Sequence, residues 1–192
     1  MQTAEIYCAV MVAMAGIAAG SNYDGYIFTC TNAITQTAMN FSSQNVGAVK
    51  YDNIGKIYRR CLLITIAISA VMSCVGFFLR EQIVWIFSKE PDVIAIGAQR
   101  LALIMPFYAF CSLQDMTTGQ VRGMGYSVAP MILSIFGACG VRLLWIFVAL
   151  PHNPTLINLY WAYPISWTVT FIAQLVMYFV AKRSLMKRKQ AA

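Results

Sequence analysis

The chain has 192 residues, of which 59% are hydrophobic and 11% are charged, and it carries a formal net charge of +7. Soluble domains contain about 45–50% apolar and about 25% charged residues, so this composition excludes a soluble globule, a disordered chain and a coiled coil. It predicts an all-α membrane protein, a polytopic helical bundle that forms a single transmembrane domain over residues 1–192.

The first apolar segment, Ile6–Val49, is uncharged apart from Asp24. As one helix it would be about 65 Å long, whereas a single crossing spans roughly 30 Å of hydrocarbon. It therefore forms either one long helix with a short stub before it, or two spans joined by a turn at Ser21–Gly25. We take the first alternative, with the helix at about residues 13–47 and an N-terminal stub before it.

Four further runs, nearly free of charge, have the length that a membrane-crossing helix requires. They predict helices at about residues 58–80, 93–121, 126–150 and 156–182, so the bundle would contain five complete transmembrane helices. The last loop carries two prolines and the single histidine, His152, and the six cysteines occur singly in apolar stretches. Neither pattern indicates a metal site, and we expect no disulfide.

Lys and Arg residues gather on one side of the predicted membrane. Ten of the 14 lie in the first and third loops and in the C-terminal tail. By the positive-inside rule, these loops and the C-terminus are cytoplasmic in a multi-pass protein of the cell (plasma) membrane. The net charge therefore reports orientation, with contact to anionic lipid as a secondary role, and we expect no nucleic-acid partner.

Three charged residues interrupt the apolar runs Ile6–Val49, Leu101–Val121 and Tyr126–Leu150, where a charge costs several kcal/mol and is a functional-site hypothesis by default. They are Asp24 in the first helix, Asp115 in the third and Arg142 in the fourth. We predict that Asp24 and Asp115 are ion-coupling residues. The alternatives are a salt bridge between Arg142 and an aspartate, a position of Asp24 at a helix end, and a position of Asp115 near the interface beside Arg122.

Polar side chains also form one stripe along the first helix, because they recur at spacings of three, four and seven residues. Amides that face lipid would stay unsatisfied, so this polar stripe faces other helices or water. Interhelical hydrogen bonding is one explanation and a water-filled substrate pathway is the other. We predict that Asn32, Gln36 and Asn40, together with Arg142, line such a cavity. The polar stripe comprises Asn22, Thr29, Asn32, Gln36, Asn40 and Ser43.

Three prolines, Pro106, Pro130 and Pro164, fall within predicted spans and are expected to interrupt them, as in transporters with broken helices. The sequence contains no phosphate-binding loop, nucleophile elbow or zinc-protease motif. We therefore predict no enzymatic activity, no catalytic residue, no metal and no cofactor other than a coupling ion.

Several segments together point to a known family. Residues 15–48 end in Gln44-Asn-Val-Gly-Ala48, and further on stand Pro106-Phe-Tyr, residues 119–130 and Gly137-Ala-Cys-Gly-Val-Arg142. In order and spacing they resemble the eighth, tenth and eleventh helices of the multidrug and toxic compound extrusion (MATE) transporters. The likeness covers residues from about 13 to 185.

The resemblance implies the C-terminal lobe of a twelve-helix transporter, whose two six-helix lobes are related by pseudo-symmetry and whose termini are cytoplasmic. In such a transporter a proton or sodium ion enters as a cationic, amphipathic compound leaves, and Asp115 resembles the acidic residue of the tenth helix. A lone lobe would expose its cavity wall to the lipid bilayer. The expected partner is therefore the missing N-terminal lobe, separately encoded, or a second copy of the chain.

The leading hypothesis is thus a secondary active antiporter, as a fragment or subunit, that exports cationic amphipathic drugs or toxins in exchange for H⁺ or Na⁺. One alternative is a lipid-linked oligosaccharide flippase, which needs several cationic residues in its cavity where this chain offers Arg142. The other alternative is a truncated membrane remnant that transports nothing.

Overall fold

The computed structural model describes residues 2–149, 151 and 155–191, and every regular element in these ranges is a helix. The prediction of an all-α, polytopic membrane protein is confirmed. Within the described residues, four helical stretches are long and apolar enough to cross a membrane: Tyr51–Phe78, Pro91–Gly123, Val128–Val148 and Ile157–Arg188. His152, and residue 150 at the end of one predicted span, lie outside the described ranges.

Helix α1 runs without a break from Gln2 to Gly47. The turn considered at Ser21–Gly25 is not formed, and the stub expected before residue 13 is the beginning of α1 rather than a separate helix. The helix contains no proline, and its hydroxyl side chains bond to its own backbone: Ser21 donates to the Ile17 carbonyl at 2.8 Å and Thr29 to the Gly25 carbonyl at 2.9 Å. These bonds satisfy polar groups without ending the helix.

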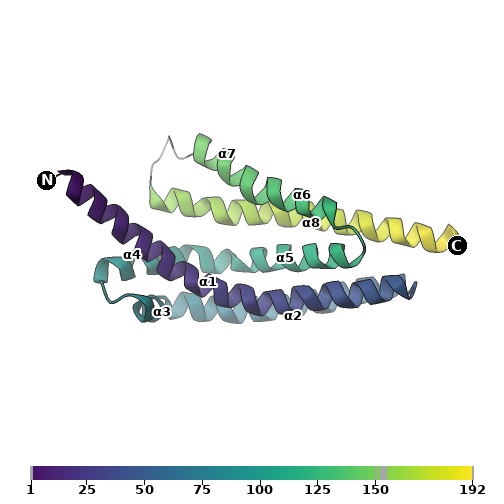
Figure 1. The fold of residues 1–192 in the computed structure, drawn as a ribbon. Coiled ribbons are helices and arrows are strands. Elements are labelled where there is room, and N and C mark those ends of the chain that lie inside the picture. Colours follow the sequence, from purple (N-terminus) through teal and green to yellow (C-terminus); the bar gives the residue numbers. More distant parts are fainter. Residues whose placement is uncertain (1, 150, 152–154, 192) are drawn as a thin grey trace.

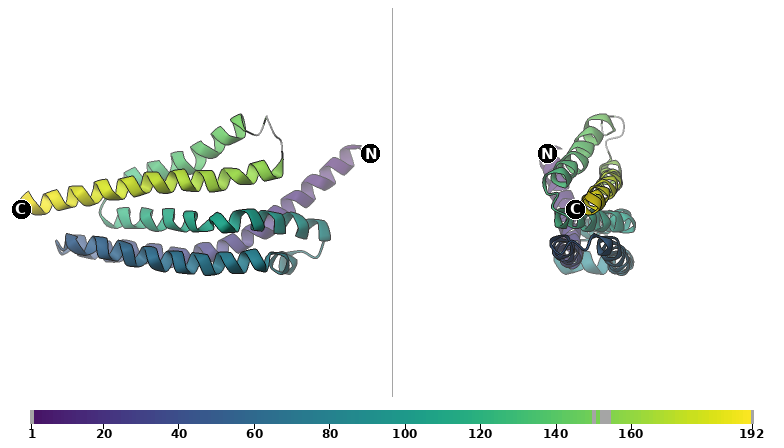
Figure 2. Two further views of the ribbon diagram at one scale, coloured as in Figure 1. Left: turned by 180° about the vertical axis from the view of Figure 1, so that it is seen from behind. Right: turned by 90° about the vertical axis from the view of Figure 1, so that its right-hand side faces the viewer.

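The remaining chain folds back and forth along α1 (Figure 1). Viewed end-on, α5 lies between the pair α1 and α2 and the pair α7 and α8 (Figure 2). Two short turns, η1 (Tyr51–Asn53) and η2 (Met105–Phe107), precede α2 and α5. The further helices are α2 (Ile54–Phe78), α3 (Arg80–Phe87), α4 (Pro91–Ile104), α5 (Tyr108–Gly123), α6 (Val128–Ile135), α7 (Val141–Val148) and α8 (Leu156–Ala191).

The three prolines within spans have three different effects. Pro106 lies in the 3₁₀ turn η2, which joins α4 to α5 inside one continuous span. Pro130 occupies the first turn of α6, where its missing N–H breaks no helical bond, so the expected interruption there is wrong. Pro164 lies inside α8, which nevertheless continues to Ala191.

A π-helical turn, η3 (Phe136–Gly140), separates α6 from α7. Gly137 in this turn faces α8 so closely that an added Cβ would lie 2.9 Å from the Cβ of Thr170. The glycine therefore lets the two helices approach, as small residues do at membrane helix contacts.

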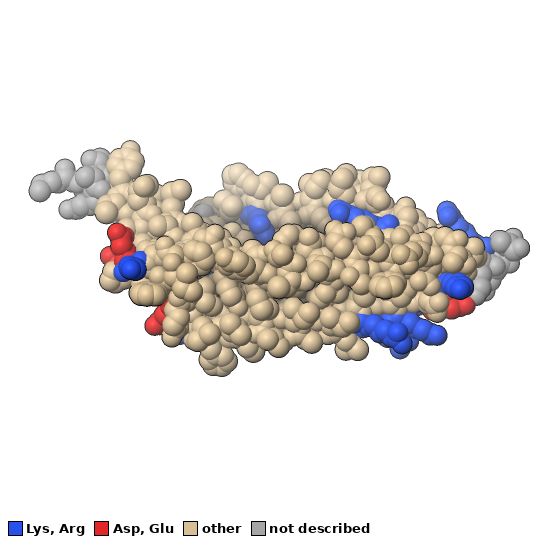
Figure 3. Space-filling model, turned by 60° about the horizontal axis from the view of Figure 1, so that its bottom comes forward, with Lys and Arg blue, Asp and Glu red and all other residues tan. Residues whose placement is uncertain are grey.

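Lys and Arg side chains concentrate toward the end of the bundle that carries the C-terminus, and several acidic side chains stand at the opposite end (Figure 3). This division follows from helices that alternate in direction along the chain. It is the charge asymmetry that the loops of the sequence predict.

Candidate functional site

A buried ion pair joins α1 to α4. The Arg100 guanidinium donates through Nη2 to Oδ2 of Asp24 at 2.6 Å; 4% of the Arg100 side chain and 20% of the Asp24 side chain are exposed. Tyr108, at the start of α5, donates its hydroxyl to the Asp24 backbone carbonyl at 3.0 Å. Asp24 thus lies in mid-helix, not at a helix end, and it is tied to two neighbouring helices.

The partner of Asp24 differs from the one that the sequence suggested. Arg142 was the cation considered for a salt bridge, whereas Arg100 was not singled out. Glycines make the observed pairing possible: a Cβ on Gly97 would lie 3.0 Å from the Gly16 carbonyl, and one on Gly20 would lie 3.2 Å from Nη1 of Arg100. The small-xxx-small spacing of Gly16 and Gly20 was the signal that could have located this contact.

Several polar atoms around the ion pair are buried without a hydrogen-bond partner among the described residues. They are Oδ1 of Asp24, Nε and Nη1 of Arg100, and the hydroxyl of Tyr160. Unpaired buried polar groups cost free energy, so each needs an explanation. A concentration of four such atoms around one charged pair marks this place as the candidate site.

Aromatic side chains form the apolar wall of the site. Tyr23 and Tyr108 belong to the buried cluster that also contains Trp167 of α8, and the rings of Tyr108 and Trp167 meet edge to face with centroids 5.6 Å apart. The Tyr23 hydroxyl donates to the Met72 carbonyl at 2.7 Å, which fixes its ring against α2. All three rings are buried, so they form packed apolar core beside the ion pair.

Asp115 lies half-buried on α5. Among the described residues, its carboxylate makes no side-chain hydrogen bond or ion pair. Asp115, Asp24 and Arg142 all lie within electrostatic range of Cys111, one turn before Asp115 on α5. The structure therefore places Asp115 on α5 and Asp24 on α1 beside the start of α5, with Asp24 charge-paired and Asp115 not. Their role in coupling stays a prediction.

Arg142 is turned toward α8 instead of an aspartate. Its Nε donates to the Ser166 hydroxyl at 3.2 Å, and its guanidinium stacks over the Tyr163 ring at 4.4 Å from the centroid. These contacts hold the charge between α7 and α8, where its side chain is half-buried. The bundle does not bring Arg142 together with the amides of α1.

The polar stripe of α1 points out of the bundle. Gln36 and Asn40 are exposed and Asn32 is half-buried, whereas Ile27, Ile34 and Ala38 on the opposite face are buried. Among the described residues, the amide groups of Asn32, Gln36 and Asn40 have no side-chain hydrogen bond. Interhelical hydrogen bonding inside this chain therefore does not account for the stripe, and its role in lining a cavity stays a prediction.

Hydrogen bonds within the bundle are made instead by polar residues that the sequence analysis left aside. Tyr58 of α2 and Thr117 of α5 are bonded at 3.1 Å, and the Gln174 amide of α8 donates to the Pro130 carbonyl at 2.8 Å and to the Ser134 hydroxyl at 3.1 Å. Each contact bridges two helices inside an apolar span. These residues do not recur at helical spacing along one helix, because each is a single polar residue that faces one neighbouring helix.

Replacing Gln174 by leucine is expected to lower the free energy of unfolding by about 1 kcal/mol, because two interhelical hydrogen bonds are lost. The effect would be measured by reversible unfolding of the purified chain in mixed micelles containing dodecyl sulfate. Gln82→Leu on α3, where the side chain is exposed, is the matched control. A Gln174→Leu variant as stable as this control would contradict the assignment.

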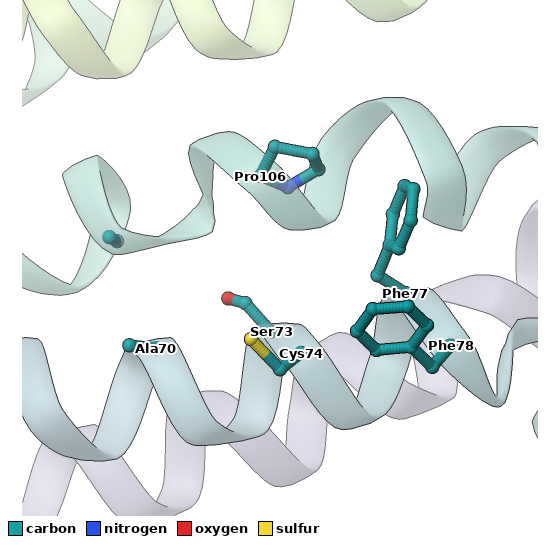
Figure 4. A pocket seen from close by; sticks show the side chains of 7 residues that line it. Ala70, Ser73, Cys74, Phe77, Phe78 and Pro106 are labelled. Carbon is teal, nitrogen blue, oxygen red and sulfur yellow. The ribbon is translucent and has the colours of Figure 1, made fainter.

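An apolar groove of about 420 Å³ lies elsewhere, between α2 and the α4–α5 junction (Figure 4). It is lined by Ala70, Ser73, Cys74, Phe77, Phe78, Pro106 and Ala109. None of the predicted site residues reaches it, so it is suited to apolar groups such as lipid chains. Among the described residues, no group of three His, Cys, Asp or Glu side chains is placed to hold a metal ion.

Comparisons with known proteins agree on one family. The family model described as MatE matches residues 11–148. A probable multidrug resistance protein YoeA of Bacillus subtilis is 24% identical over 69% of the chain and 29% of its own length. A probable multidrug resistance protein NorM of Thermotoga maritima is 21% identical over 73% of the chain and 30% of its own length. The chain thus spans less than a third of these curated relatives.

Proposed function

The chain belongs to the MatE family, and from this premise we propose that it forms one membrane lobe of a drug efflux transporter. The lobe takes part in exporting cationic, amphipathic drugs or toxins, and a proton or sodium ion moving inward supplies the energy. It corresponds to the C-terminal lobe, resides in the cell membrane and has a cytoplasmic C-terminus. It needs no cofactor beyond the coupling ion and acts as a transporter without catalysis.

The observation that carries this proposal is the outward-facing polar stripe. Unsatisfied amides against lipid cost free energy, so a row of them on a membrane helix requires water or a partner. In alternating-access transporters the two halves meet around a hydrated midplane cavity. A partner lobe opposite α1 would convert the half-buried Asn32 and the exposed Gln36 and Asn40 into the wall of such a cavity.

The partner that fits this surface is a matching lobe. Either an N-terminal lobe or a second copy would supply the opposite wall. Cys30 on α1 is exposed and therefore available to report which of the two is present. Oxidative cross-linking of membranes at Cys30 gives a covalent dimer of the chain if two copies face each other, and none if a different lobe covers α1.

The flippase alternative is less well supported by the contacts of the cationic residues. A pyrophosphate site needs several cations that converge on one cavity. Arg142 is held by Ser166 and Tyr163, and Arg100 is held by Asp24. Neither guanidinium points into the stripe of α1, so the efflux proposal is preferred.

Alanine substitution of Asn32, Gln36 and Asn40 together is expected to lower drug export about tenfold, because three polar contacts of the cavity wall are lost. Export of ethidium would be measured in cells that produce the chain alone or together with an N-terminal lobe from a relative. Phe147→Ala on α7, a position outside the polar stripe with 75% exposure, is the control. Export that persists unchanged in the triple variant would refute the cavity. Absence of export in every arm would favour a remnant that transports nothing.

A further inference from the structure

A polar pocket of about 360 Å³ lies where α1 ends and α2 begins (Figure 1). We propose that it binds the phosphate group of an anionic glycerophospholipid, whose acyl chains lie on the apolar surface of the bundle next to it. The lipid is held at the surface and is not transported, so the proposal goes beyond the efflux function and does not depend on it. The pocket is lined by Phe41 and Asn45 of α1, Asn53 of η1, and Lys56, Ile57 and Arg60 of α2.

Two cations of the pocket have no counter-ion. Lys56 and Arg60 are four residues apart on α2, so their side chains are neighbours on one face of the helix. Both side chains are exposed, and among the described residues neither makes a salt bridge or a hydrogen bond. Asp52, the one acidic residue within positions 50–60, does not line the pocket. Because like charges at this spacing repel each other, an anion placed between them is stabilised.

Two asparagine amides add hydrogen-bond donors at fixed positions. Asn53 donates through Nδ2 to Oδ1 of Asn45 at 3.1 Å, and Asn45 donates through Nδ2 to the Phe41 carbonyl at 2.8 Å. These bonds hold the end of α1 against η1. An amide nitrogen carries two N–H donors, so each asparagine keeps one of them for a further acceptor. A phosphate accepts such bonds and pairs at the same time with lysine and arginine.

The depth of the pocket favours a phosphate of the bilayer over a phosphate in solution. Residues 61–78 of α2 carry no charge and measure about 27 Å as a helix, close to the hydrocarbon thickness of roughly 30 Å. Arg60 therefore stands at the boundary of the hydrocarbon. Lys56 stands one turn farther out, at the level of the lipid headgroups.

Apolar side chains continue from the pocket toward the membrane interior. Leu63 and Ile64 follow Arg60 by one turn on the same face of α2, and they are 65% and 50% exposed. Phe41, on the α1 side of the pocket, is 52% exposed. A ligand with both a phosphate and acyl chains matches the cations and this apolar surface together, whereas inorganic phosphate matches the cations alone.

The local charge selects the class of lipid. Positions 50–60 contain four Lys or Arg residues and one acidic residue. A choline or ethanolamine headgroup would bring its own ammonium group among these cations, whereas phosphatidylglycerol offers its phosphate without one. Clusters of Lys and Arg next to a membrane span attract anionic lipids in this way.

The test titrates dioleoylphosphatidylglycerol into the purified full chain in detergent and measures bound lipid by native mass spectrometry, with the shift in Tm as a second measurement. Lys56→Gln/Arg60→Gln is expected to weaken binding about tenfold to thirtyfold, because two cations at the membrane surface are lost. Arg183→Gln/Lys187→Gln, at exposed positions of α8, removes the same net charge and should leave binding unchanged. Equal weakening in the two double variants would show that net charge alone attracts the lipid and would overturn the site.

Two further ligands identify what is recognised. Dioleoylphosphatidylcholine, with the same chains, is expected to bind wild type as weakly as phosphatidylglycerol binds Lys56→Gln/Arg60→Gln. Wild type that binds both lipids equally would refute recognition of the anionic headgroup. Sodium phosphate is expected to leave the bound lipid in place. Inorganic phosphate that displaces the lipid, at an ionic strength where sodium chloride does not, would make the ligand a soluble anion and overturn the lipid assignment.

Discussion

Arg100→Leu is expected to lower the free energy of unfolding by about 3–5 kcal/mol, because it leaves the Asp24 carboxylate buried and uncompensated. Asp24→Leu is expected to cost a similar amount, since the remaining guanidinium is 4% exposed. The double variant Asp24→Leu/Arg100→Leu should recover most of the loss, because an apolar pair of similar volume suits a membrane interior. Unfolding in mixed micelles, arranged as a double-mutant cycle, measures the coupling directly.

The exposed Arg59 provides the control for this cycle. Arg59→Leu removes a charge of the same kind from the surface and should change stability by no more than about 0.5 kcal/mol. Strictly additive losses from the two single variants would show that Asp24 and Arg100 do not interact. A double variant as unstable as the worse single variant would show that some other contact of these residues matters more.

Larger side chains at Gly119 and Gly123 are expected to force α5 away from α1. A Cβ on Gly119 would lie 2.8 Å from the Thr35 carbonyl oxygen, and one on Gly123 would lie 2.9 Å from the Met39 Cα. Because the obstacles are backbone atoms, they cannot move aside as a flexible side chain would. Each valine substitution should therefore cost about 1–3 kcal/mol, and the double variant should not assemble a native bundle.

Gly25 on α1 is the matched control for these substitutions, because no atom lies within 4 Å of the Cβ that alanine would add there. Gly25→Ala should stabilise the helix by about 0.5–1 kcal/mol, since alanine restricts the unfolded chain more than glycine does. Unfolding in mixed micelles measures all three variants. Valine at Gly119 or Gly123 that proves as harmless as alanine at Gly25 would contradict the close approach of α1 and α5.

Individual residues show where sequence reasoning succeeded and where it did not. Polarity spacing placed Asn32, Gln36 and Asn40 on one face, which the structure also shows, because helical periodicity is a local property. The same reasoning did not single out Arg100, because a charge at the edge of an apolar run usually lies at the membrane surface. Its burial depends on glycines of α1 and α4. The paired side chains of these helices, Asp24 and Arg100, are 76 residues apart in the sequence.

The sequence by itself determined the class of the protein, its charge asymmetry, its family likeness and four of its five predicted membrane spans; the fifth, at about residues 13–47 in α1, is not among the described helices that are long and apolar enough to cross a membrane. Each of these follows from composition or from the order of residues along the chain, since hydropathy and helix length are summed over neighbouring residues. Only the tertiary structure decided that Asp24 pairs with Arg100, that Arg142 binds to α8, and that the stripe of α1 faces outward. Those facts depend on which helices pack together and at what rotation, and helix packing is set by close contacts between residues distant in the chain.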